Sequence, residues 1–236
     1  MNVFITIWNR FSWAIPLCED FTKAGLTVIL IDNASTYPPC IEWLKSCPYK
    51  VHFMEKNESA WAFFTTSLYK EYTDRYFMVS DSDQDISGLP SDWVDVLMKG
   101  LEETSDGVWK SGLSQEIEDL PKDNPYAQEI YNYEKNYWTN VNKDGYYKVW
   151  MDIGVAIYDR SRRNDDPIHD VVGENRSWYA AVRSPRPYVS RHLDWYLTPE
   201  KFREEDIYYL NGGDWARADT AHYGWLFNWE KKYKNK

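Results

Sequence analysis

The chain has 236 residues, with 27 Lys and Arg against 37 Asp and Glu, and its formal net charge at pH 7 is -10. A chain of this length can bury a sizeable α/β core without disulfides or structural metals. Its negative charge argues against broad binding of nucleic acid, because such binding needs a basic stripe. We therefore predict a single domain over residues 1–236 with no nucleic-acid partner.

No run of eighteen apolar residues occurs, and the N-terminus lacks the charge and apolar pattern of a signal peptide. We therefore expect no integral membrane segment and a cytoplasmic location. The three cysteines, Cys18, Cys40 and Cys47, have spacings that match neither a zinc module nor a disulfide framework. We expect them to be free thiols in a reducing compartment.

The first third of the sequence alternates apolar runs with amphipathic segments. The apolar runs predict strands at 3–8, 27–31, 51–54 and 76–80, and the amphipathic segments predict helices at 11–24, 41–46 and 59–72. Gly25 is placed to end the first helix. Continuous apolar strands separated by helices indicate a mainly parallel sheet that is covered on both faces.

Beyond residue 90 the pattern is looser. It predicts helices at 91–103 and 125–138, strands at 108–113, 147–158, 179–182 and 188–193, and an exposed loop at 160–176. The Lys-rich segment 231–236 is expected to be a frayed tail.

In a parallel α/β sheet, ligands bind where strands end at their carboxyl side. Three of these strand ends are unusually polar. They are Trp8-Asn9-Arg10, Ile31-Asp32-Asn33-Ala34-Ser35-Thr36 and Ser80-Asp81-Ser82-Asp83-Gln84-Asp85.

Asp81 and Asp83 flank one residue directly after a predicted buried strand. Their carboxylates can converge on one Mn2+ or Mg2+ ion, and Asp85 adds a third carboxylate. Such an ion stabilises the negative charge that develops on a departing diphosphate. We expect neither Asp81 nor Asp83 to belong to the core. The alternative is an acidic turn that caps the next segment.

The order of these motifs resembles that of GT-A glycosyltransferases, in particular the small bacterial and large-DNA-virus enzymes. The resemblance covers most of the chain. It is carried by Asp32-Asn33-Ala34-Ser35, Phe77-Met78-Val79-Ser80-Asp81-Ser82-Asp83 and Arg191-His192-Leu193-Asp194-Trp195-Tyr196. It implies an α/β fold of the GT-A (Rossmann-like) type, with a nucleotide-sugar-binding half at 1–90 and a mixed, acceptor-side half at 91–230.

The resemblance implies that Asp32 accepts a hydrogen bond from the donor base, with Asn9 and Arg10 near the base or ribose. Asp81 would contact the nucleotide through the metal, and Asn57 stands where relatives have an Asn near the diphosphate or ribose. Two alternatives remain open, an Asx-type turn at Asp32 and an ordinary helix cap at Asn57.

Asp152 precedes Gly154 and an apolar run, and this segment resembles the strand behind the donor sugar in several retaining enzymes. The resemblance implies that Asp152 contacts sugar hydroxyls or the acceptor and, with Asp83, belongs to the catalytic residues. As alternatives, Asp152 is the general base of an inverting enzyme, or Gly154 marks a bulge in an edge strand.

A late-chain histidine in GT-A enzymes commonly binds the metal or contacts the diphosphate, and His192 is the candidate here. His222 is a rival for this role. Arg191 would neutralise phosphate charge, while Trp195 and Tyr196 would line the acceptor site or pack in the core.

These features predict a metal-dependent glycosyltransferase that moves a hexose or deoxyhexose from a nucleotide-diphosphate sugar, with UDP favoured, to a glycan hydroxyl. Retention of anomeric configuration is slightly favoured over inversion. A non-catalytic glycan-binding module is one alternative, because 13 Trp and 19 Tyr could stack on sugars. A sugar-phosphate nucleotidyltransferase is less favoured, because the segment after the first strand lacks a glycine-rich phosphate loop.

Overall fold

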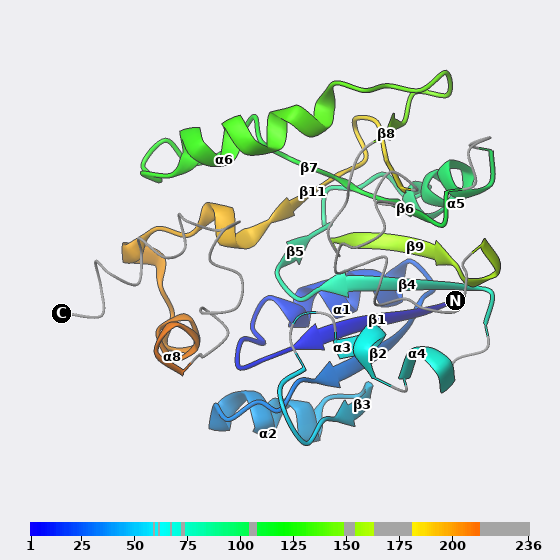
Figure 1. The fold of residues 1–236 in the computed structure, drawn as a ribbon. Coiled ribbons are helices and arrows are strands. Elements are labelled where there is room, and N and C mark those ends of the chain that lie inside the picture. The colour runs from blue at the N-terminus through cyan, green and yellow to red at the C-terminus, as the bar shows by residue number, and fades with distance from the viewer. Residues whose placement is uncertain are drawn as a thin grey trace.

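The computed structural model describes residues 1–58, 60, 62–66, 68–71, 74–103, 108–148, 154–162 and 181–212. Within this part of the chain, an eight-stranded sheet has the order β3-β2-β1-β4-β9-β6-β10-β8 (Figure 1). Its strands are β1 (Asn2–Ile7), β2 (Thr27–Asp32), β3 (Lys50–Phe53), β4 (Tyr76–Asp81), β6 (Lys110–Gly112), β8 (Tyr147–Lys148), β9 (Val155–Asp159) and β10 (Ala181–Arg183).

The first four strands of the chain run parallel, as predicted. Phe4 of β1 pairs with Ile29 of β2 on one side and with Val79 of β4 on the other. β9 is antiparallel to both β4 and β6, and β8 is antiparallel to β10. The sheet is therefore mainly parallel, and its antiparallel strands come from the second half of the chain.

A small second sheet joins the two halves beside the carboxyl end of β4. It contains β5 (Gln84–Asp85), β11 (Val189–His192) and β7 (Ser114–Gln115) in the order β5-β11-β7. β11 is antiparallel to β5, and His192 lies opposite Gln84. This pairing brings a late segment of the chain next to the turn after β4.

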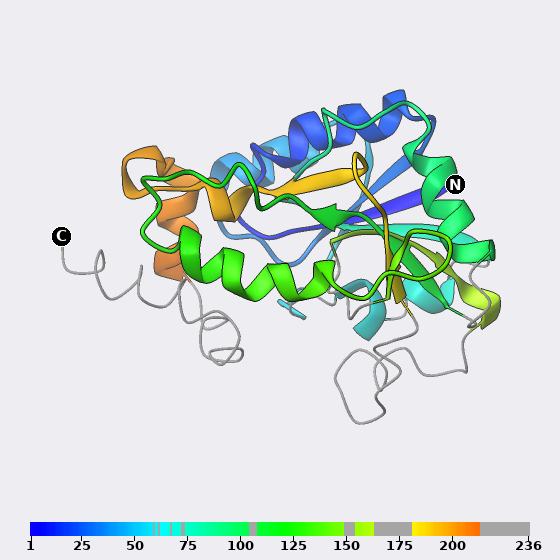
Figure 2. The same ribbon diagram turned by 90° about the horizontal axis from the view of Figure 1, so that it is seen from above.

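The large sheet has apolar layers on both faces because its strands are apolar at successive positions. Val3 and Ile5 pack with Leu17 of α1 (Ala14–Lys23) and Leu97 of α5 (Trp93–Glu103), whereas Phe4 packs on the opposite face. That second layer includes α3 (Ala62–Thr65) and α4 (Leu68–Glu71). Figure 2 shows the sheet between α1 and α5 on one side and α6 (Ala127–Glu134) on the other.

Two further helices are α2 (Pro38–Ser46), which packs in the same apolar layer as α1, and α8 (Glu204–Gly212), which contacts the loops after β1 and β2. Short 3-10 turns are η1 (Lys135–Trp138), η2 (Arg160–Arg162), η4 (Leu193–Tyr196) and η5 (Pro199–Lys201). Gly25 ends α1 with a φ of 78°, as predicted for a helix C-terminus. Within the described residues, no helix has the length and apolar character needed to cross a membrane.

Two sequence predictions of secondary structure are wrong. The helix predicted at 59–72 is interrupted between α3 and α4, where the Thr66 hydroxyl donates to Ala62 O and accepts from Leu68 N–H. This side chain competes with the helical backbone for its hydrogen-bonding groups. The single strand predicted at 147–158 is two strands, and β6 and β10 lie between them in the sheet. Gly154 has a φ of 47° just before β9, and extended backbone does not adopt this conformation.

Candidate metal centre

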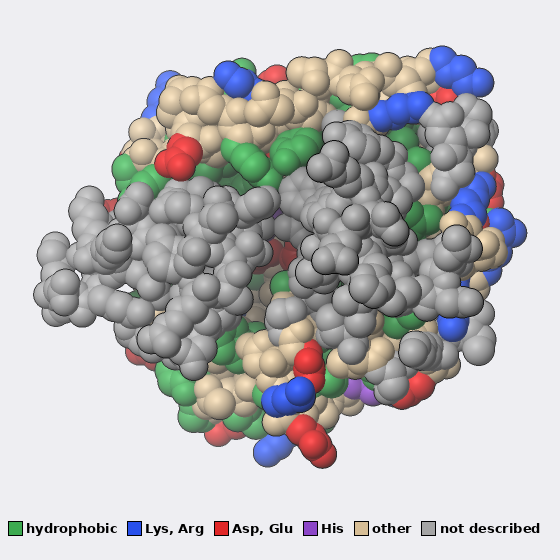
Figure 3. All heavy atoms as spheres, viewed as in Figure 1, with side chains coloured by type: hydrophobic (Ala, Val, Ile, Leu, Met, Phe, Trp, Pro, Cys, Tyr) green, Lys and Arg blue, Asp and Glu red, His purple; other side chains and the backbone are tan. Residues whose placement is uncertain are grey.

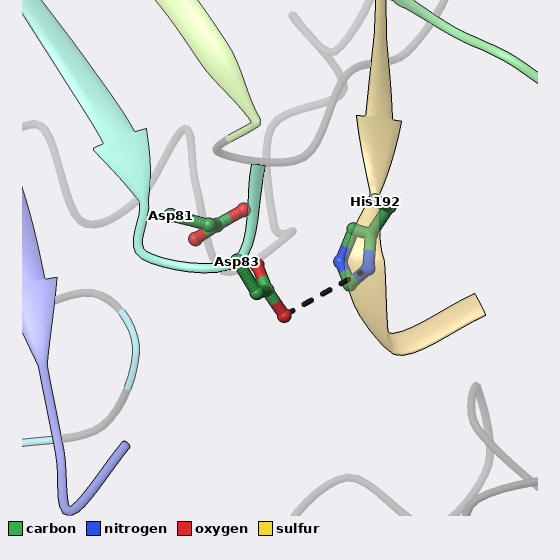
Figure 4. A group of neighbouring side chains, drawn as sticks. All are labelled: Asp81, Asp83 and His192. Atoms are coloured by element: carbon green, nitrogen blue, oxygen red, sulfur yellow. Dashed lines mark ion pairs between the residues drawn. The ribbon is translucent and has the colours of Figure 1, made fainter. Parts of the chain in front are cut away.

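Three side chains that could hold a metal ion converge at the carboxyl end of β4. Asp81 ends this strand, Asp83 follows in the turn to β5, and His192 ends β11 (Figure 4). One potential ligand atom from each side chain lies within 4.8 Å of the other two. The pairing of β5 with β11 produces this arrangement, because it places His192 beside the acidic turn.

The described donor set fits a divalent cation. His192 Nδ1 is buried and has no hydrogen-bond partner, and the imidazole is stacked on Trp195 with ring centroids 5.1 Å apart. A buried nitrogen without a partner is costly unless something else satisfies it. Two carboxylates and one imidazole supply the oxygen and nitrogen ligands that such ions accept.

Asp83 is more deeply placed than the sequence suggested. Its residue exposure is 6%, so the expectation that Asp83 lies outside the core is wrong. Its Oδ2 is 3.5 Å from Arg10 Nη2 and 3.8 Å from His192 Nδ1. This carboxylate is buried among charged groups rather than among apolar side chains, because late segments of the chain fold over it.

The buried carboxyls of Asp83 and Asp194 have pKa values shifted in opposite directions. Burial raises the pKa of Asp83, and the neighbouring Asp194 adds to this rise against the opposing charges of His192 and Arg10. Burial also acts to raise the pKa of Asp194, but the Arg10 guanidinium outweighs it and holds that pKa below its usual value. Arg10 thus stabilises the charged form of Asp194 more than that of Asp83, because it donates hydrogen bonds to Asp194.

Arg10 is surrounded by carboxylates. It donates to both oxygens of Asp194 from η4, and its Nη1 is 3.9 Å from Asp206 Oδ1 of α8. Its guanidinium lies over the Tyr209 ring, 4.1 Å from the centroid. The structure thus places Arg10 beside Asp83 at the metal centre, and its expected contact with base or ribose stays a prediction.

The other polar residues at the strand ends bind one another. Asn9 has a φ of 61°, and its Oδ1 accepts from the backbone N–H of Thr36 at 2.6 Å. Asp32 Oδ1 accepts from Ser35 N–H at 3.0 Å, so the turn that the sequence left open is present. Asn57 Oδ1 accepts from the side chain of Asn33 at 3.0 Å. These bonds join the loops after β1, β2 and β3, and the proposed nucleotide contacts of Asn9, Asp32 and Asn57 stay predictions.

Several predicted residues do not meet at the centre. Arg191 points to the opposite side of β11 from His192, and its Nε donates to Asp119 Oδ2 at 2.7 Å. Tyr196 OH donates to Asp119 Oδ1 at 2.5 Å. Asp85, the predicted third carboxylate, accepts from Ser87 N–H at 2.9 Å and is not in the ligand group. Trp195 is buried against His192, while Asp152 and His222 lie outside the described residues.

Sequence reasoning did not identify Asp206 and Glu205 of α8 as neighbours of the strand ends. Glu205 Oε2 accepts from the N–H groups of Phe11 and Ser12 at 3.1 and 3.2 Å. In sequence, these acids resemble the ordinary first turn of a helix. No local signal identifies their partners, because the contacts join residues almost 200 positions apart.

Acidic side chains are visible near the centre of the face in Figure 3. Hydrophobic side chains lie above them, at the position that α6 occupies in Figure 1. Both groups are seen from the side of the large sheet that carries α6.

Neither protein-family models nor curated proteins match the chain. Among solved structures, HddC from Yersinia pseudotuberculosis complexed with GMP-PN is similar, with 15% identity and a TM-score of 0.51 over 86% of this chain and 99% of that chain. TarS 1-349 from S. aureus in complex with UDP-GlcNAc has 17% identity and a TM-score of 0.35 over 49% of this chain and 34% of that chain. The chain therefore matches only about a third of TarS 1-349.

At these identities the similarity concerns the fold alone. The match to HddC extends over nearly the full length of that chain and supports an α/β fold of the GT-A or Rossmann-like type. The narrower resemblance to small bacterial and large-DNA-virus enzymes stays a prediction.

Proposed function

We propose that this protein is a metal-dependent glycosyltransferase that uses a nucleotide-diphosphate sugar as donor. The observation that carries the proposal is the convergence of Asp81, Asp83 and the unpartnered Nδ1 of His192 at the carboxyl edge of a mainly parallel sheet. This edge is where α/β proteins bind nucleotides. Two carboxylates at a diphosphate-binding position need a cation, since they would otherwise repel the ligand.

In this proposal Asp81, Asp83 and His192 hold Mn2+ or Mg2+, which when bound neutralises charge on the diphosphate. The loops joined by Asn9, Asp32 and Asn57 bind the nucleoside. Arg10 keeps Asp83 in place while its own charge is balanced by Asp194. The transferred group is a hexose or deoxyhexose, the base is uracil, and the acceptor is a glycan hydroxyl. Asp152 contacts the sugar or acceptor in a reaction that retains configuration.

A sugar-phosphate nucleotidyltransferase is the second candidate. The match to HddC, which was solved with GMP-PN, favours it and makes a guanine nucleotide worth testing. The segment after β1 argues against it, because Asn9 is fully buried and Arg10 is paired with carboxylates there. A phosphate loop would instead present backbone N–H groups to the ligand.

The decisive measurement is thermal unfolding with Mn2+, UDP, GDP and each nucleotide together with Mn2+. A ligand at a hundredfold excess over its Kd stabilises by about 2.7 kcal/mol, which for a chain of this size is roughly 5–10 °C in Tm. We expect UDP with Mn2+ to raise Tm by this amount and UDP alone to have little effect. A response to free glycans without any response to nucleotides would identify a glycan-binding module instead.

Asp81→Asn and Asp83→Asn test the proposed ligands without large changes in side-chain volume. Each is expected to abolish the Mn2+-dependent part of the UDP shift. Asp85→Asn is the matched control, because this carboxylate lies in β5 directly after the turn but accepts hydrogen bonds from Ser87. The assignment fails if both ligand variants keep the full shift. A screen of nucleotide sugars for slow hydrolysis, with NMR of the product anomer, then identifies the donor and the stereochemistry.

A further inference from the structure

Glu134 and Arg183 form a buried ion pair that the proposed function has not used. Glu134 ends α6 and is 2% exposed, while Arg183 ends β10 and is 5% exposed. Arg183 Nη1 donates to Glu134 Oε1, and the Tyr137 ring lies 4.8 Å from the guanidinium carbon. Both charges are thus withdrawn from water, on the side of the sheet that carries α6.

The pair is a neighbour of the metal centre. Ile130 lies one helical turn before Glu134 and packs in one cluster with Trp195, which stacks on His192. The charge of His192 also reaches Glu134, where it opposes the rise in pKa that burial causes. Glu134 therefore lies near the metal centre, on the side of the sheet that carries α6.

The hydrogen-bonding capacity of the pair is incomplete. Arg183 Nε is buried and has no partner, although a buried guanidinium N–H that lacks an acceptor is costly. Nε–H and the Nη1 that binds Glu134 lie on different edges of the planar guanidinium, so the free donor and the carboxylate face separate partners. Hydroxyl groups on a sugar ring can serve both, because each hydroxyl can both donate and accept.

We infer that Glu134 and Arg183 bind hydroxyl groups of the transferred sugar of the nucleotide-sugar donor. Arg183 Nε donates to one hydroxyl oxygen, and the Glu134 carboxylate accepts from a different hydroxyl. This inference rests on the proposed function, because the metal-bound diphosphate fixes the position of the sugar. The pair thereby sets which sugar is accepted, since an analogue without the matching hydroxyl leaves buried charges unsatisfied.

The test separates the sugar from the nucleotide. Titration calorimetry with Mn2+ gives Kd for UDP, UDP-glucose, UDP-galactose, UDP-GlcNAc, GDP and GDP-mannose. For the wild type we expect at least one nucleotide sugar to bind tenfold more tightly than its diphosphate. The sugar ratio is the Kd of the diphosphate divided by the Kd of its nucleotide sugar. Glu134→Gln and Arg183→Lys are expected to reduce the sugar ratio to near one, while the Kd of the diphosphate changes less than twofold.

Asp159→Asn is the matched control. Asp159 is a fully buried carboxylate in a pair with Arg75, and it lies opposite Tyr76 at the amino end of β4, away from the metal centre. Its loss should lower Tm and leave the sugar ratio unchanged. Circular dichroism and Tm identify variants that do not fold. If Glu134→Gln does not fold, Arg183→Lys decides the question, because lysine keeps the buried positive charge.

Three outcomes would overturn the inference. The wild type shows no preference for any nucleotide sugar, the folded variants keep the wild-type ratio, or they weaken diphosphate and nucleotide sugar equally. If neither UDP nor GDP binds the wild type with Mn2+, the proposed function itself fails. Failure of the sugar subsite alone would leave diphosphate binding intact.

Discussion

Glu116 shows how one side chain can combine a turn and an ion pair. Its Oε1 accepts from the N–H groups of Ile117 and Glu118 at 2.9 and 2.8 Å, and its carboxylate pairs with Arg186. The hydrogen bonds from Arg186 outweigh burial and lower the pKa of Glu116 from 4.5 to about 2. The folded state therefore favours the ionised form more strongly than the unfolded chain does.

Glu116→Gln should reduce the free energy of unfolding at pH 7 by on the order of 1–2 kcal/mol, since Arg186 is partly exposed. A carboxyl group whose pKa is lowered by folding stabilises the fold at any pH above its unfolded-state pKa. This stabilisation is lost as the pH falls from the unfolded-state pKa toward the folded-state pKa. The difference between wild type and variant should therefore shrink between about pH 4.5 and pH 2. Urea denaturation across this range measures it, and a difference that does not depend on pH would contradict the assignment.

At the scale of elements, α5 packs against the sheet through a glycine. A Cβ added to Gly100 would lie 2.5 Å from Ser111 Oγ of β6 and 2.7 Å from Tyr146 Cε1. Glycine is unfavourable inside a helix by about 1 kcal/mol relative to alanine. Its presence here permits the close approach of helix and strand.

Gly100→Ala should therefore destabilise the protein by about 1–3 kcal/mol, even though alanine is the better helix former. Denaturant unfolding provides the measurement. Gly88→Ala serves as the control, because a Cβ there meets nothing within 4 Å and should change stability by less than about 0.5 kcal/mol. An increase in stability for Gly100→Ala would show that the close approach of α5 to Ser111 and Tyr146 does not require glycine at this position.

The elements also show what the sequence could predict. β1, β2, β3 and β4 were predicted to within about two residues. For β1, β2 and β4 the reason is that strands buried on both faces are continuously apolar, whereas β3 is a partly exposed edge strand. The break at Thr66 was not predicted, since it depends on one side-chain hydrogen bond. The separation of β8 from β9 was not predicted either, since it depends on the left-handed conformation of Gly154. Asp81 and Asp83 were placed by the end of β4. The docking of α8 and the pair of Glu134 with Arg183 arise from contacts between distant segments, which leave no local pattern.

At the scale of the whole molecule, Arg10 connects segments from both ends of the chain. It follows β1 and lies close to the carboxylates of Asp83, Asp194 and Asp206. Glu205 and Tyr208 of α8 add hydrogen bonds to the loops after β1 and β2. The single guanidinium thus supports an assembly of acidic groups that would otherwise repel one another.

Arg10→Met should lower the free energy of unfolding by about 3–5 kcal/mol, because it leaves buried carboxylates without a counter-charge. In the double variant with Asp194→Asn, the loss in free energy of unfolding should be smaller than the sum of the losses in the two single variants. The reason is that the carboxylate neutralised by Arg10 is then absent. Chemical denaturation of the wild type, both single variants and the double variant measures this coupling. Strictly additive costs would show that Asp194 is not the principal partner of Arg10.

The meeting of Asp83 with His192 also bears on the folding pathway. The two residues are about 110 positions apart in sequence, and closing so long a loop has an entropic cost that must be met before the ligands assemble. A ribosome-bound chain that ends before residue 192 lacks the imidazole. In the proposed function, capture of a cation by all three ligands is therefore a late event, and the ion would stabilise a completed sheet rather than nucleate it.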